Sequence, residues 1–96
     1  MITHVVMFKV KDPVAELTAE IKARLMALPP KIEQIKHYEV GINIVESARA
    51  YDLVLISKFD DLDALRAYQV HPAHMQELQF IVANTSSIIA ADYESE

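Results

Sequence analysis

A chain of 96 residues is long enough for one domain but only for a small core. The formal net charge is −5 and the nine Lys and Arg residues are scattered, so we expect no nucleic-acid partner, which would require a basic stripe. The absence of cysteine excludes disulfides, thiolate nucleophiles and Cys-based zinc sites.

The apolar segments of the chain are short. The first one, residues 5–8, is too short for the core of a signal peptide. No segment approaches the roughly 18 apolar residues that a membrane span needs. We therefore expect a cytoplasmic protein with no membrane partner.

The sequence of the first third of the chain predicts a strand followed by a helix. Thr3–Lys11 is rich in β-branched and aromatic residues, which favours a strand. Asp12 and Pro13 then resemble the N-cap and the first residue of a helix, which Pro29-Pro30 ends. The helix is amphipathic, since its apolar residues recur at three- and four-residue steps: Val14, Leu17, Ile21, Leu25 and Leu28.

Two more strands follow, with a polar connection between them. His37–Val45 alternates, and the polar connection is Glu46–Ala50. Tyr51–Phe59 is the next predicted strand. The residues expected on one face of the earlier strand are Tyr38, Val40, Ile42 and Ile44.

The remaining third predicts a broken helical segment and a last strand. One helix begins at Asp60-Asp61, a second begins at Pro72, and Ser86–Glu94 is the final strand. The apolar residues are Leu62, Leu65 and Tyr68 in the first of these helices and Met75, Leu78 and Val82 in the second. The order β-α-β-β-α-β predicts an α+β fold, a four-stranded antiparallel sheet with helices on one face.

Two of the strands are apolar on both faces. A sheet with one wet face alternates apolar and polar residues, but residues 5–8 and 53–56 do not alternate. Helices on one side leave the other apolar face uncovered, and such a patch is large for a monomer. We therefore expect a homodimer formed through the sheet faces.

The sequence AYQVHPAH, residues 67–74, gathers chemistry-bearing residues around Pro72. With Pro72 as the first helical residue, His71 is the N-cap and His74 lies in the first turn. The positive helix end disfavours imidazolium, so we expect a low pKa and a neutral general base at His74. Tyr68 ends the preceding helix, and its hydroxyl can donate to a carbonyl or enolate oxygen.

Other interpretations of these residues are structural or metal-binding. Tyr68 can be a core residue at a helix end, and His74 a solvated residue of the first turn. A metal site would take His71 and His74 with His4 or a carboxylate, but Pro72 disturbs the helical spacing of the first two. We therefore expect neither a metal nor a cofactor.

Two histidines lie in predicted strands. His4 has the parity of Val6 and Phe8, so it can point under the helices. His37 has the opposite parity to Tyr38, so we expect it to face outward or toward the partner subunit.

Three stretches, THVVMFKVKD, YDLVLISKFDDLDALRAYQVHPAH and AADYE, resemble in order the stress-responsive α/β-barrel family, called Dabb. The resemblance implies one ferredoxin-like βαββαβ domain over residues 1–96 that forms a dimeric α+β barrel. One plant member of that family is a polyketide cyclase without a cofactor, and its catalytic tyrosine and histidine match Tyr68 and His74. The resemblance implies catalytic roles for these two residues and substrate contacts for His4 and His71.

The sequence thus predicts a homodimer that binds a small apolar or aromatic metabolite between sheet and helices. In one version it performs cofactor-free acid–base chemistry of the cyclase or isomerase type. The alternative is a non-catalytic stress-responsive binding protein, in which Tyr68, His71 and His74 organise the helix junction. Monooxygenases and haem-handling proteins share the wider fold, and that third interpretation rests on fold analogy alone.

Overall fold

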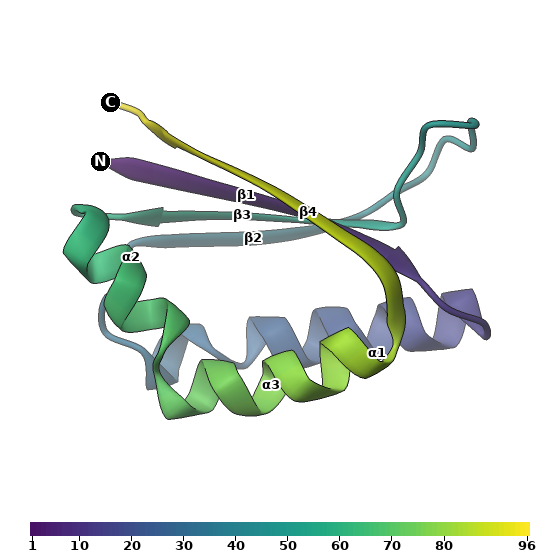
Figure 1. Ribbon diagram of the computed structural model, residues 1–96, viewed down its shortest axis with the longest axis horizontal. Helices are drawn as coiled ribbons and strands as arrows, with labels where there is room; N and C mark the ends of the chain where they lie inside the picture. The colour runs from purple at the N-terminus through teal and green to yellow at the C-terminus, as the bar shows by residue number, and fades with distance from the viewer.

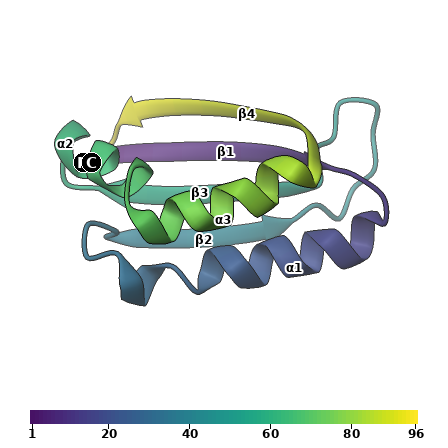
Figure 2. The same ribbon diagram turned by 60° about the horizontal axis from the view of Figure 1, so that its bottom comes forward.

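A computed structural model describes residues 1–96, which form a single sheet with helices on one face (Figure 1). The spatial order of the antiparallel strands is β2-β3-β1-β4. The strands are β1 Ile2–Val10, β2 His37–Ile42, β3 Leu53–Phe59 and β4 Thr85–Glu94. The helices are α1 Val14–Met26, the 3₁₀ turn η1 Pro29–Lys31, α2 Leu62–Gln69 and α3 Pro72–Ala83 (Figure 2). This is the ferredoxin-like α+β fold that the sequence predicted.

The core lies between the sheet and the helices. The strand register places Val6 of β1 between Leu55 of β3 and Ala90 of β4, all on the face that the helices cover. From α1 and the segment after it, Ile21 and Ile32 are completely buried against this face. The longest helix, α1, has 13 residues, and no helix combines the length and hydropathy that crossing a bilayer requires.

The start of α1 differs from the prediction. Pro13, not Asp12, occupies the N-cap position, with an extended backbone (ψ 114°) and no side-chain cap. Leu17 N–H donates to the Pro13 carbonyl at 3.0 Å, so the helix begins at Val14. For α2 the prediction is confirmed, because Asp61 Oδ1 accepts from Ala64 N–H at 2.8 Å.

Strand β2 ends earlier than predicted. Ile44 and Val45 were expected to continue it, but their exposed fractions are 94% and 68%. Asn43 Nδ2 donates to the Val45 carbonyl at 2.8 Å, which gives the backbone a local turn in place of the ladder. Beyond Ile42, Asn43 N–H still donates a backbone hydrogen bond to the Asp52 carbonyl. The connection between β2 and β3 is therefore longer than the polar segment alone.

Helix α3 is rotated relative to its predicted apolar side. Met75 and Val82 are 45% and 54% exposed, whereas Ile81 is 3% exposed. Leu78 belongs to both faces, since a spacing of three or four residues on either side of it satisfies the helical period. Packing against the sheet selects the side that carries Ile81, and His74 lies one turn before Leu78 on that side.

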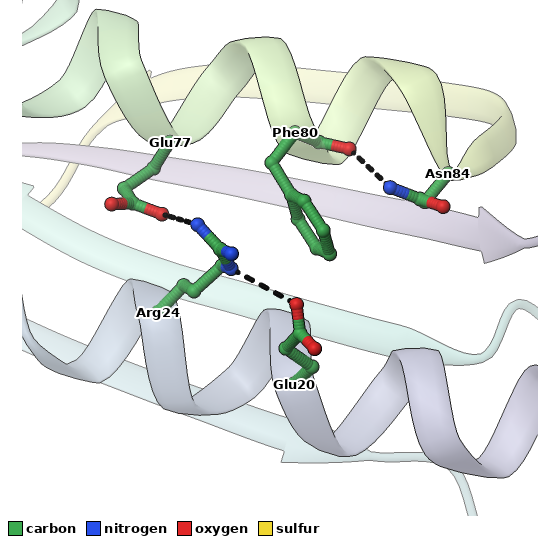
Figure 3. A network of polar contacts seen from close by, with 5 residues as sticks. All are labelled: Glu20, Arg24, Glu77, Phe80 and Asn84. Carbon is green, nitrogen blue, oxygen red and sulfur yellow. Dashed lines mark hydrogen bonds and ion pairs between the residues drawn. The ribbon is translucent and has the colours of Figure 1, made fainter.

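Arg24 connects α1 to α3 on the outside of the helical layer (Figure 3). Its Nη1 donates to Glu77 Oε2 and its Nε donates to Glu20 Oε2, both at 3.2 Å. The guanidinium lies 3.8 Å from the centroid of the Phe80 ring. Asn84 Nδ2 donates to the Phe80 carbonyl at 2.8 Å near the end of α3. The contacts of Arg24 with Glu77 and Phe80 hold the two helices side by side on the same face of the sheet.

Candidate functional site

A cavity of about 290 Å³ lies between the sheet and α1, α2 and α3. Nine of the 12 lining residues are hydrophobic, Tyr68 included. The remaining three are His4, Gln69 and His74. A largely apolar pocket with a few convergent polar groups is the usual form of a small-molecule site.

Tyr68 lies at the end of α2 with its side chain completely buried. Its ring is tilted against Phe59 and His74, at centroid distances of 4.9 and 4.5 Å. Its hydroxyl forms a 2.8 Å hydrogen bond with the hydroxyl of Tyr38 from β2. Burial raises the pKa of Tyr68 to about 12, although the hydrogen bond with Tyr38 acts in the lowering direction. Burial also raises the pKa of Tyr38, and so does its interaction with Tyr68. Both tyrosines are therefore neutral near pH 7.

His74 occupies the first turn of α3, as predicted. Its Nδ1 is 3.0 Å from the carbonyl oxygen of Gln69, which can only accept, so Nδ1 carries the proton. Nε2 is then the basic nitrogen of the ring. Burial lowers the pKa of His74, as do His4 and His71 through charge repulsion, and the hydrogen bond to Gln69 opposes them. The predicted direction of this shift agrees with the structure, but burial is the main cause.

His4 points under the helices from β1 and is 7% exposed. Its Nδ1 bonds to the carboxylate of Asp92, its cross-strand partner on β4. Its ring meets that of Tyr68 edge-on, with centroids 6.4 Å apart. The carboxylate orients the imidazole, in the way that such partners usually fix a histidine. Asp92 was missed in the sequence, and its parity in the last strand was the available signal.

His71 is not among the residues that line the cavity. Its Nδ1 accepts from Ala73 N–H at 3.1 Å, so the ring caps the start of α3. No three His, Asp or Glu side chains in the chain gather into a group that could hold a metal ion. His37 is exposed at the start of β2, as its parity predicted.

Tyr38 was also missed as a site residue. The alternation of β2 placed it on the same face as Val40 and Ile42, so its inward direction was predictable. Its contact with Tyr68 depends on how α2 crosses the sheet, which the sequence pattern does not specify. A larger hollow of about 450 Å³ lies beside Met7, Gly41 and the β2–β3 connection, but no histidine or carboxylate lines it.

The fold and the cavity together define a ferredoxin-like domain with an apolar pocket that has one polar end. The chain belongs to the stress responsive A/B barrel domain family, Dabb, whose profile matches residues 2–95.

Three similar proteins illustrate the range of this fold. An uncharacterized protein of Streptomyces coelicolor is 35% identical over 97 residues, covering 98% of this chain and 99% of that protein. A dimeric protein with a ferredoxin-like fold from Bacteroides fragilis is 31% identical with a TM-score of 0.86, covering 98% of this chain and 95% of that one. A hydroxynitrile lyase from Passiflora edulis has a TM-score of 0.86 at 14% identity, with coverage of 99% and 93%, which is a likeness of fold alone.

Proposed function

We propose that this protein is a homodimer that binds a small neutral carbonyl compound, apolar or aromatic, in the cavity under its helices. We propose further that His74 and Tyr68 perform cofactor-free acid–base chemistry on it. The observation that carries the proposal is the 3.0 Å hydrogen bond between the Gln69 carbonyl and Nδ1 of His74. The Nδ1 proton is held by the Gln69 carbonyl, which leaves a basic Nε2 beside a neutral tyrosine in an apolar cavity.

The proposed step is a proton transfer. His74 Nε2 removes a proton from the carbon next to the ligand carbonyl, and the electron pair of the C–H bond moves to make an enolate. The Tyr68 hydroxyl donates to the developing oxyanion, and burial strengthens that interaction. His4, held by Asp92, is a second polar contact for the ligand. Return of the proton from His74 to another position gives isomerisation. Attack of the enolate carbon on a second carbonyl gives ring closure, and the alkoxide that forms takes the proton back from His74.

The charge of the lining supports a neutral ligand. No Lys or Arg lines the cavity, so nothing there would neutralise a buried carboxylate or phosphate. Asp92, behind His4, adds negative charge on this side. The small volume favours a monocyclic or short-chain compound, since about 300 Å³ is the lower end for ligand pockets.

The dimer part of the proposal rests on the uncovered face of the sheet. Met7 of β1 and Ile89 of β4 lie there as neighbours, 39% and 47% exposed. Val5, Val54 and Ile56 flank them on the same face. A second copy would bury this apolar surface in a two-fold interface. The Bacteroides fragilis protein, at 31% identity, is dimeric.

Deuterium exchange tests the chemistry without knowledge of the natural substrate. Acetophenone, a neutral aromatic ketone, is incubated with the protein in D₂O, and NMR follows the loss of its methyl protons. We expect exchange faster than in buffer, with His74→Ala returning it to the buffer rate, because a positioned base contributes about 10²–10⁴-fold. His37→Ala, which changes an exposed histidine outside the cavity, is the matched control. Exchange that survives His74→Ala in the folded protein would refute the mechanism.

A non-catalytic binding protein is the second candidate. The observation in its favour is that the Tyr68 hydroxyl already has a partner in Tyr38 and that its side chain is completely buried. In that case acetophenone would bind, as native mass spectrometry would detect, but its methyl protons would exchange at the buffer rate.

A further inference from the structure

We propose that Tyr38 is a positioning residue that directs the hydroxyl proton of Tyr68 into the cavity. This inference rests on the proposed function, because it concerns the group that donates to the ligand oxygen.

Two hydroxyl groups that share one hydrogen bond cannot both donate in it. The Tyr38 and Tyr68 oxygens are 2.8 Å apart, and the rings meet edge-on at 6.2 Å and 64°. Each hydroxyl carries one proton, so the residue that accepts in this bond keeps its own proton free for another acceptor. The function of the site depends on which residue that is.

The surroundings of the two hydroxyls decide the direction. Tyr38 is not among the residues lining the cavity, and Tyr68 is the only hydrogen-bond partner of its hydroxyl. If Tyr68 donated to Tyr38, its only proton would be used in that bond, and Tyr38, which does not line the cavity, could not offer its own proton to a ligand there. If Tyr38 donates instead, both groups are satisfied once a ligand oxygen accepts from Tyr68.

A hydrogen bond donated by Tyr38 also strengthens Tyr68 as a donor. When Tyr68 donates to the ligand oxygen, negative charge builds up on its own oxygen, and the Tyr38 O–H stabilises that charge. Hydrogen bonds in a chain reinforce one another in this way. The titratable groups facing Tyr68 are Tyr38 from β2, His4 from β1 and His74 from α3. Among these, Tyr38 is the one bonded to its oxygen, and it acts to lower the pKa of Tyr68.

Fluorine NMR of ligand-free protein labelled with 3-fluorotyrosine tests whether the Tyr38 hydroxyl stabilises negative charge on the Tyr68 oxygen. The Tyr68 signal is assigned by its absence in Tyr68→Phe, and its titration midpoint is compared between the unsubstituted chain and Tyr38→Phe. We expect Tyr38→Phe to raise the midpoint. Loss of packing alone would admit water and lower it, so an unchanged or lower midpoint would overturn the inference. Tyr51→Phe is the matched control, since its hydroxyl bonds to Ser87 outside the cavity.

The carbonyl stretch of bound acetophenone gives a second readout. A hydrogen bond from Tyr68 lowers this infrared frequency, so we expect Tyr38→Phe to move it back toward the free value and to slow deuterium exchange by roughly tenfold. A bound ketone with an unshifted frequency in Tyr38→Phe would count against the inference. If acetophenone does not bind the unsubstituted protein at all, the proposed function fails for this ligand class, while the fluorine titration still tests whether Tyr38 donates to the charged Tyr68 oxygen.

Discussion

At the scale of single residues, Tyr38 and Tyr68 depend on each other in an interior with few polar partners. Removing either hydroxyl leaves the other without its hydrogen bond. We expect Tyr38→Phe and Tyr68→Phe each to lower the free energy of unfolding by about 1 kcal/mol. The double variant should lose less than the sum, with a coupling of about 0.5–1.5 kcal/mol. Urea unfolding of the four proteins measures this, and additive losses would contradict the shared bond.

The pH dependence of stability reports on His74. Its pKa in the folded protein is lowered, mainly by burial, from an unfolded value near 6.5. The unfolded chain therefore binds more protons as the pH falls below about 7, so this residue stabilises the fold above that pH and the contribution is lost on acidification. We expect the free energy of unfolding of His74→Gln to fall less steeply between about pH 7 and 5 than that of the unsubstituted protein.

A substitution of a group that does not titrate supplies the control for this measurement. Val82 is exposed on α3 outside the cavity, so Val82→Ala should retain the slope of the unsubstituted protein. Equal slopes for all three proteins would mean that His74 titrates in the fold as it does in the unfolded chain.

Local sequence pattern predicted only some of the residues of the candidate site. The positions of His71 and His74 at the start of a helix followed from Pro72, and strand parity placed His4 under the helices. Tyr38 and Asp92 lie 30 and 88 residues along the chain from their partners, and their contacts arise only when the strands assemble. Alternation along a strand indicates the face on which each residue lies, but residue spacing does not indicate which distant residue it meets.

At the scale of elements, His71 lies at the junction between α2 and α3. Substitutions of this residue test whether it stabilises the fold or contacts a ligand. Its Nδ1 accepts from Ala73 N–H at 3.1 Å, which caps α3. We expect His71→Ala to lower the free energy of unfolding by about 1 kcal/mol, and His71→Asn, a good cap, to restore most of it. Deuterium exchange of acetophenone should be unchanged in His71→Asn. A loss of exchange in that stable variant would place His71 in the ligand site after all.

The elements themselves were predicted better than their ends and faces. All four strands and three α-helices follow from hydrophobic period and turn residues, because these signals extend over many positions. The end of β2 depended on one side-chain hydrogen bond of Asn43. The inward side of α3 depended on packing against the sheet, since Leu78 is compatible with either orientation.

At the scale of the whole molecule, the two faces of the sheet have different roles. One face and the helices enclose the core and the cavity, while the other presents apolar residues of β1, β3 and β4 with no cover from this chain (Figure 1). A cavity placed on the covered face leaves the open face free for association. Ligand binding and dimer formation are therefore separable by substitution.

A substitution at Met7 can separate dimer formation from ligand binding. Met7 lies at the middle of β1, paired with Val54 on one side and Ile89 on the other, and its side chain is 39% exposed. In a dimer formed through this face, Met7→Glu would bury an unpaired carboxylate in each copy, which is strongly unfavourable. We expect native mass spectrometry to give twice the chain mass for the unsubstituted protein and the single chain mass for Met7→Glu.

The matched control for the open face is Val82→Glu, which places the same charge on an exposed position of α3, on the opposite side of the sheet. It should keep the dimer mass. A single chain mass for the unsubstituted protein would mean that the open face is solvated, and the inference from strands apolar on both sides would be wrong. A dimer that survives Met7→Glu would place the interface on another surface. Because Met7 does not line the cavity, a folded Met7→Glu monomer that still exchanges acetophenone protons would show that each subunit carries a complete site.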